Sequence, residues 1–246
     1  MFNKKGWSLD ASVGYAQKNN LFSTDEMVCT KTLYNYVDLG ILPIKNIDLP
    51  EKLKRNTKSS STRKNRKILG KSIEERPETV NLREEFGHWE IDSVLGKKKD
   101  TEPAIMTIVE RKTRMSLWIK IKDHSSMAID EALQSLINRF GTKKSEVFKS
   151  ITGDNGSEFA NLSNIENNGI SVYFTHPYTS CEKGTNECHN KMLRRFIPKG
   201  KSIDDYSAED ILFFSDTING LPRKILNYHT PCLLYTSDAA DDGESV

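Results

Sequence analysis

Three carboxylates in separate runs constrain this chain more than any other feature: Asp92, Asp154 and Glu187. The first lies in a strand-like run, residues 89–95, in which side chains alternate between two sides. Trp89 and Ile91 fall on one side of this strand, and Asp92 falls on the other. A carboxylate in the middle of a strand is costly to bury unless a metal ion or another partner compensates its charge.

Asp154 follows a second strand candidate, residues 146–152, whose apolar members are Val147, Phe148 and Ile151. The next two residues, Asn155 and Gly156, form a strong turn signal. An acid at the carboxyl end of a strand, just before a turn, lies where open α/β sheets place their ligands. The plainer alternative is that Asp154 is only a turn residue.

Glu187 opens a helical pattern in which Thr185 is a candidate N-cap. An apolar stripe follows at four-residue spacing, formed by Cys188, Met192 and Phe196. Glu187 then lies in the first turn, on a different face from this stripe. Alternatively, Glu187 is only a favourable charge at a helix N-terminus.

Other nearby acids compete for the same role: Glu90, Glu158 and Glu182. Glu182 precedes Gly184 and is expected in a loop, which favours Glu187. The three preferred carboxylates have no Cys/His cluster nearby, so they suit Mg²⁺ or Mn²⁺ rather than zinc. Two such ions, roughly 3.5–4 Å apart, can activate water on one side of a phosphodiester and stabilise the leaving oxygen on the other.

Five motifs occur in a specific order: GHWEID at 87–92, DNGSEF at 154–159, PYTS at 177–180, EKGTNE at 182–187 and RRFIPKG at 194–200. With these motifs the chain resembles the DDE transposases of bacterial insertion sequences, and most closely the insertion-sequence thirty family. The resemblance extends from Trp7 to Pro231. In that family's motif the glutamate follows an asparagine, as Glu187 follows Asn186.

The resemblance implies an α/β fold, with a ribonuclease-H-like, retroviral-integrase-like core preceded by a small helix-turn-helix-like module. It also implies that Asp92, Asp154 and Glu187 hold two Mg²⁺ or Mn²⁺ ions. The implied activity is a polynucleotidyl transfer, in which transposon ends are cleaved and joined to target DNA. Asn155 and Gly156 would shape the site. The expected assembly is a homo-oligomer on DNA, in the bacterial cytoplasm and associated with the nucleoid when bound.

Two other functions remain open for this chain. It could be a nuclease of the same fold without strand transfer, or an inactive DNA-binding remnant. The remnant is considered because the chain starts too late to hold the family's first helix-turn-helix. Its last residues, 232–246, resemble a translated sequencing adapter. A truncated gene fragment is therefore expected.

Basic residues point to a nucleic-acid partner. Between Glu51 and Lys71 there are nine Lys or Arg and one acid, a local balance of +8 (9 − 1). Candidate DNA-binding residues lie in the second N-terminal helix, in this basic run and around the third acid: Lys31, Asn35, Arg63, Lys64, Arg66, Lys67, Lys183, Lys191, Arg194 and Arg195. The alternatives are a solvated linker for the run and an ion-pair ladder for the helix.

Four segments are expected: a partial helical DNA-binding module at 1–50, a basic linker at 51–85, the catalytic core at 86–231 and the non-native tail. The first segment is predicted to contain a helix over 11–18, capped by Ser8 or Asp10, and a helix over 31–39, capped by Thr30. Within the core we predict strands at 104–109, 115–121 and 172–175 besides the two already described, and helices at 126–140 and 207–218. Four cysteines without paired spacing favour a reduced cytoplasmic protein. No apolar run approaches the ~20 residues of a membrane span, so no membrane partner is expected.

Overall fold

The computed structural model describes residues 6–49, 69–97, 102–176 and 180–235. Contacts divide the chain into two compact units. Of the described residues, one unit comprises 6–49 and 220–235, and the other comprises 69–97, 102–176 and 180–219. Among the described helices, none combines the length and the apolar character needed to cross a bilayer.

The first unit contains helices α2 (Leu9–Lys18) and α3 (Thr30–Asp38), which match the two predicted N-terminal helices to within two residues. The Ser8 hydroxyl caps α2 by accepting a hydrogen bond from the amide of Ala11 at 3.0 Å. Thr30, predicted to cap α3, is instead its first helical residue, and Cys29 is the N-cap. A small apolar core lies between the helices, formed by Leu9, Val37 and Leu49.

Residues near the end of the described chain pack within this same unit. Gly14 of α2 faces the Tyr228 ring so closely that an added Cβ would lie 1.9 Å from a ring carbon. Lys18 Nζ also donates to the carbonyl of Asn227 at 2.7 Å. The absence of a side chain at Gly14 leaves room for the ring, and the contacts group residues 220–235 with the N-terminal helices.

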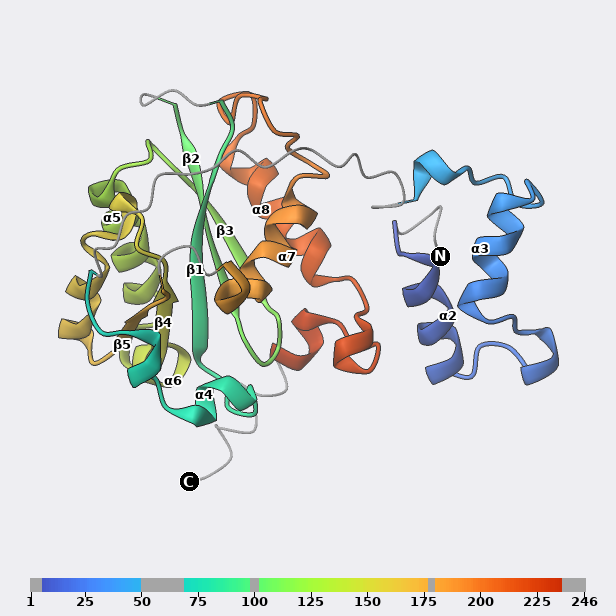
Figure 1. The fold of residues 1–246 in the computed structure, drawn as a ribbon, viewed down its shortest axis with the longest axis horizontal. Helices are drawn as coiled ribbons and strands as arrows, with labels where there is room; N and C mark the ends of the chain where they lie inside the picture. The colour runs from blue at the N-terminus through green and yellow to red at the C-terminus, as the bar shows by residue number, and fades with distance from the viewer. Residues whose placement is uncertain (1–5, 50–68, 98–101, 177–179, 236–246) are drawn as a thin grey trace. The chain divides into compact units, whose positions relative to one another are not determined.

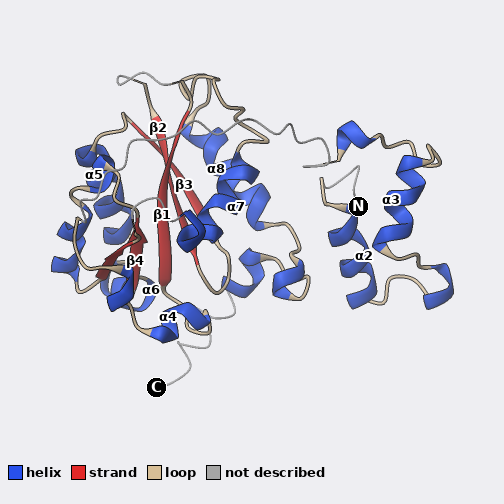
Figure 2. Cartoon of the chain, viewed as in Figure 1, coloured by secondary structure: helices blue, strands red, loops and turns tan. Residues whose placement is uncertain are grey.

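The second unit is built on one five-stranded sheet, shown in Figures 1 and 2. Its strands are β1 (His88–Leu95), β2 (Ala104–Glu110), β3 (Ser116–Ile121), β4 (Ser150–Gly153) and β5 (Ser171–Phe174). Their spatial order is β3-β2-β1-β4-β5. The first three strands are antiparallel, whereas β4 pairs parallel to both β1 and β5. This is the arrangement expected of a ribonuclease-H-like core.

Helices cover both faces of the sheet (Figure 1). Helix α5 (Ser126–Asn138) lies on one face, and α7 (Gly184–Leu193) and α8 (Ala208–Asn219) lie on the other. The strand β1 therefore has two buried sides. Trp89 donates through Nε1 to the carbonyl of Val147 at 2.7 Å on the α5 side, while Glu90 and Asp92 contact α7.

The strand predicted over residues 146–152 begins only at Ser150. Helix α6 (Lys144–Val147) precedes it, and the amide of Phe148 still donates to the carbonyl of Lys144 at 2.8 Å. The Val147 carbonyl is used by the Trp89 indole rather than by a neighbouring strand. These contacts explain why the apolar pair at 147–148 does not extend the strand.

The apolar stripe predicted for α7 is wrong. Cys188 is exposed and Met192 is only half-buried, whereas the buried residues are Thr185, Asn186, His189 and Leu193. The helix packs on polar groups of the sheet, so its inner face is largely polar. Thr185, predicted to be the N-cap, lies inside the helix, and Lys183 occupies the cap position.

Residues 69–85, predicted to belong to the linker, pack on the core. They include the short helix α4 (Glu78–Leu82). The buried Arg76 guanidinium donates through Nη1 to Thr152 Oγ1 at 3.0 Å, and the amide of Phe174 donates to the carbonyl of Lys71 at 2.8 Å. Four predicted DNA-binding residues lie outside the described residues: Arg63, Lys64, Arg66 and Lys67.

Candidate active site

Two of the three predicted carboxylates meet at adjacent parallel strands. Asp92 lies in β1, and Asp154 directly follows Gly153 at the carboxyl end of β4. Their side chains are 20% and 39% exposed, respectively. The strand pairing therefore places the two aspartates side by side, at the point where β4 ends, with both side chains partly exposed.

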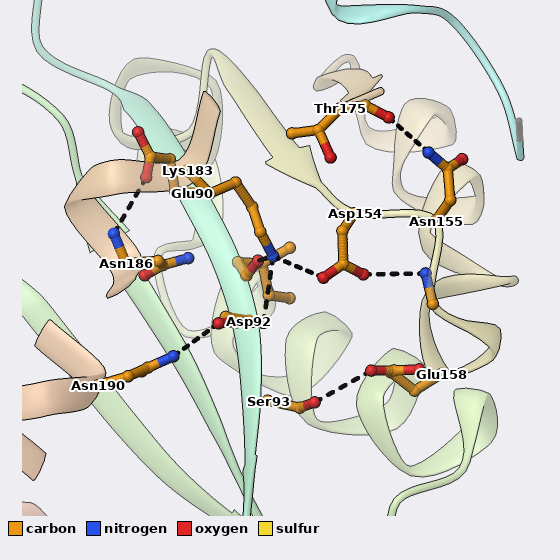
Figure 3. A network of polar contacts seen from close by, with 12 residues as sticks. Glu90, Asp92, Ser93, Asp154, Asn155, Glu158, Thr175, Lys183, Asn186 and Asn190 are labelled. Carbon is orange, nitrogen blue, oxygen red and sulfur yellow. Dashed lines mark hydrogen bonds and ion pairs between the residues drawn. The ribbon is translucent and has the colours of Figure 1, made fainter. Parts of the chain in front are cut away.

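Lys183 lies between these aspartates (Figure 3). Its Nζ donates to Asp92 Oδ1 at 3.1 Å, to Asp154 Oδ2 at 3.0 Å and to the carbonyl of Ile91 at 3.1 Å. Burial lowers the pKa of Lys183, but the two carboxylates raise this pKa by more, so the amine remains a charged ammonium. Lys183 is one of the predicted DNA-binding residues, and the sequence contains no signal for this bridging position.

The second oxygen of each aspartate has its own donor. Asn190 Nδ2 donates to Asp92 Oδ2 at 2.6 Å, and the amide of Gly156 donates to Asp154 Oδ1 at 2.9 Å. Asn190 was not among the predicted site residues. It lies three positions after Glu187, a spacing that places two residues on one helix face, and that spacing could have identified it.

Asn155 and Gly156 shape the loop that holds Asp154. The Asn155 side chain donates to the carbonyl of Thr175 and accepts from the amide of Leu69 at 3.0 Å. An added Cβ on Gly156 would lie 2.4 Å from the Glu158 carboxylate. These contacts connect the loop after β4 to two neighbouring segments.

Glu187 lies in the first turn of α7 with an exposed side chain. The structure places Lys183, rather than Glu187, between the two aspartates. However, Lys183, four positions before Glu187, and Asn190, three positions after it, both contact Asp92. Residues at these spacings share one side of a helix, so Glu187 lies on the side of α7 that faces Asp92.

The three competing acids have other partners. Glu90 is fully buried, pairs with Arg111 and accepts from the amide of Asn186 at 3.2 Å. Glu182 accepts from His176, whose Nδ1 lies 2.7 Å from Oε1. Neither acid is available to join the aspartates in this arrangement.

The third competitor, Glu158, belongs to a cluster beside Asp92. Ser93 Oγ lies 2.7 Å from His124 Nε2 and donates to Glu158 Oε1 at 3.2 Å. The hydrogen bond with Glu158 raises the pKa of His124. Burial raises the pKa of Glu158, but the hydrogen bonds from His124 and Ser93 reverse this effect and lower the pKa overall.

Two exposed basic residues lie on α7 and just after its end, Lys191 and Arg195. Arg194, also predicted to bind DNA, is half-buried and donates through Nη2 to the carbonyl of Leu95 at 2.8 Å. In the other unit, Lys31 and Asn35 are exposed on α3 at a four-residue spacing. Four of the predicted DNA-binding residues are therefore accessible to a phosphate backbone: Lys31, Asn35, Lys191 and Arg195.

The oxygen atoms around Lys183 suit a hard divalent cation. Two carboxylates and one carbonyl already converge on a single positive charge, and Mg²⁺ commonly binds through one or two carboxylates while keeping several waters. Within the described part of the chain, no group of three or more His, Cys, Asp or Glu is arranged to hold a metal ion. The oxygens of Asp92 and Asp154 thus fit such an ion, and the Glu187 carboxylate does not belong to this group of oxygens.

The chain is similar to several known proteins. An integrase core domain family model matches residues 83–180, which include both aspartates. The chain is 45% identical over 206 residues to a probable transposase for the insertion-like sequence element IS1161 of Streptococcus salivarius, covering 84% of this chain and 58% of that protein. It is 33% identical over 165 residues to the transposase InsI of IS30A from Escherichia coli strain K12, covering 67% of this chain and 42% of that protein.

A third relative is the transposase of insertion sequence element IS4351 from Bacteroides fragilis, 37% identical over 65% of this chain and 47% of that protein. The chain thus spans about half the length of these relatives. Among solved structures, the catalytic core domain of BIV integrase matches with a TM-score of 0.47 and 18% identity, covering 64% of this chain and 98% of that one.

Proposed function

Because this chain belongs to the DDE transposases of the insertion sequence IS30 family, we propose that it cleaves DNA at insertion-sequence ends and joins those ends to target DNA. One observation carries the proposal: Asp92 and Asp154, from two adjacent parallel strands, direct oxygens at a single cation-sized position. Divalent metal dependence is implied for this family, and we propose two Mg²⁺ or Mn²⁺ ions held by Asp92, Asp154 and Glu187.

The proposed chemistry consists of two phosphoryl transfers. Water first attacks the phosphorus at a transposon end, and the departing oxygen takes up a proton to become a free 3′ hydroxyl. That hydroxyl then attacks a target phosphodiester, so one bond is formed for each bond broken. The bound ions would lower the pKa of the attacking group and stabilise the departing oxygen.

The residues of this chain position the reactants. Asn190 and the amide of Gly156 orient the aspartate oxygens, since each donates to one carboxylate. Glu187 lies on the side of α7 that faces Asp92, which supports its role as the third ligand. For this it would need to approach the aspartates more closely than it does here.

DNA is the proposed partner, bound through phosphate contacts. Lys191, exposed on α7, and Arg195, exposed just after the end of this helix, would hold the reacting strand, with Arg194 beside them. On α3, Lys31 and Asn35 form an exposed polar pair that suits contact with a duplex. We further propose a homo-oligomer, because two ends must be joined, and a cytoplasmic, nucleoid-associated location, because that is where bacterial DNA lies.

The direct test is cleavage and joining of a supercoiled plasmid carrying insertion-sequence ends, in Mg²⁺ or Mn²⁺. Asp154→Asn keeps the side-chain shape and removes the charge, so metal-dependent nicking and joining should both fall by at least about 100-fold, in line with the loss of a group that stabilises transition-state charge. Asp205→Asn, the same change at an exposed acid, should leave both unchanged.

The same assay separates the alternatives. A same-fold nuclease would nick the plasmid but would not join a pre-cut end to it. An inactive remnant would bind DNA and cut in neither metal. If nicking persists in Asp154→Asn, the proposed aspartate site is not the source of the activity.

A further inference from the structure

We propose that Lys183 is an internal counter-ion, which occupies the cation position between Asp92 and Asp154 in the metal-free protein and must leave before a divalent ion can bind there. This inference rests on the proposed metal-dependent function. It adds a competition between a side chain of the protein and the ion, and the competition can be measured without DNA.

The surroundings of Lys183 form a complete cation site. An ammonium has three protons to donate, and here all three have an oxygen acceptor: Asp92 Oδ1, Asp154 Oδ2 and the carbonyl of Ile91. The Phe159 ring lies 5.6 Å from Nζ, within the range of a cation–π interaction. The lysine side chain is only 7% exposed, so this is a buried position and not a surface contact.

Electrostatics explains why the protein would place a lysine there. Two carboxylates that share a site repel each other, and a neighbouring positive charge offsets this repulsion. The ammonium therefore stabilises the aspartate pair when no metal is present. A divalent ion would need the same two oxygens, Asp92 Oδ1 and Asp154 Oδ2, and would meet a like charge about 3 Å away if the lysine remained.

The position of Lys183 in the chain suits such an exchange. It is the N-cap of α7, at the junction with the short η7 turn (Ser180–Lys183), so it is not held within a helix interior. Glu187 lies one helical turn later on the same side. Departure of the ammonium would remove a positive charge from between the aspartates. It would also leave space beside the face of α7 on which Glu187 lies.

The first test measures Mn²⁺ binding to the full chain by calorimetry, using wild type, Lys183→Gln and Lys71→Gln. Lys71 is the matched control because it is an exposed lysine that also forms an ion pair, but with neither aspartate. Its Nζ lies 2.8 Å from Glu166 Oε1. We expect Lys183→Gln to bind Mn²⁺ about tenfold more tightly or better, because a like charge at roughly 3–4 Å is removed. Its metal-free melting temperature should fall, and Lys71→Gln should bind as wild type does.

A second measurement uses only the wild-type protein and remains valid if Lys183→Gln fails to fold. Amine-reactive labelling, read by mass spectrometry, reports how accessible each lysine is. Labelling of Lys183 should rise several-fold when Mn²⁺ is added, while labelling of Lys71 stays constant. Unchanged Lys183 labelling at a saturating Mn²⁺ concentration would overturn the inference.

The outcomes also distinguish this inference from the proposed function. If Mn²⁺ binding is lost in Asp154→Asn but is not tightened in Lys183→Gln, the aspartate site stands and the counter-ion role is refuted. If wild type and Lys183→Gln both fail to bind Mn²⁺, the proposed metal site and the inference fall together.

Discussion

At the scale of single residues, acids that look alike in the sequence have different roles. Asp92 and Asp154 share a lysine ammonium, Glu90 is buried against Arg111, and Glu187 is exposed. The role of each carboxylate depends on which charged group lies beside it, not on whether the residue is Asp or Glu. A carboxylate is available to a metal ion only if its partner can be displaced, which separates the aspartates from Glu90.

The His124–Glu158 pair should make stability depend on pH. The pKa of His124 is raised above its ordinary value of about 6.5, so its pairing is fully present below that pH and is lost as pH rises through the folded-state pKa. The melting temperatures of wild type and His124→Gln, measured from pH 5.5 to 8.5, should therefore differ most at the acidic end. A difference that grows with pH would contradict this assignment.

At the scale of elements, α7 is attached to the sheet through polar contacts. Glu90 of β1 accepts from the amide of Asn186, and Arg114 Nη1 donates to Thr185 Oγ1 at 2.8 Å. Burial lowers the pKa of Arg114 to about 10, yet this guanidinium remains charged at neutral pH. The start of α7, and with it the position of Lys183 and Glu187, therefore depends on a buried charged network.

Removing Arg111 should disrupt this network strongly. Arg111→Met leaves the fully buried Glu90 without its ion-pair partner, and we expect a loss of about 3–5 kcal/mol in the free energy of unfolding. Chemical denaturation provides the measurement. Adding Glu90→Gln to this variant removes the uncompensated charge and should restore part of the loss.

The control for this prediction is Lys122→Met, which breaks an exposed pair with Glu131 at 3.2 Å. Exposed pairs contribute roughly 0–1 kcal/mol, so this variant should unfold almost as wild type does. Equal losses in both variants would show that burial does not govern the Arg111 interaction.

At the scale of the whole molecule, the chain forms two compact units, each with its own candidate DNA contacts. Its net charge is only +2, so the proposed attraction to DNA would come from local groups of Lys and Arg rather than from the overall charge. The predicted segment bounds at 50, 85 and 231 remain predictions. The contact pattern places residues 220–235 with the N-terminal helices, which the linear order of the chain did not indicate.

If α3 contacts phosphates, Lys31→Ala should weaken DNA binding similarly for all sequences. It should also reduce the slope of log affinity against log salt concentration by about 1. Fluorescence anisotropy at several salt concentrations measures both quantities. Lys45→Ala removes an exposed lysine of the same unit outside α3, and an equal effect of this control would argue against a specific role for the helix.

The sequence by itself determined the five strands of the sheet, except where β4 begins, and where two site residues lie on them. Alternation of side chains placed Asp92 opposite Trp89 and Ile91 on β1, and the turn signal placed Asp154 at the end of β4, because both patterns are local. Tertiary structure decided the partners. Lys183 lies between aspartates that are 91 and 29 positions away, and only the packing of α7 on the sheet determines such contacts. The apolar stripe predicted for α7 is wrong for the same reason: the part of the sheet that the helix covers is polar, so the inner face of the helix is polar as well.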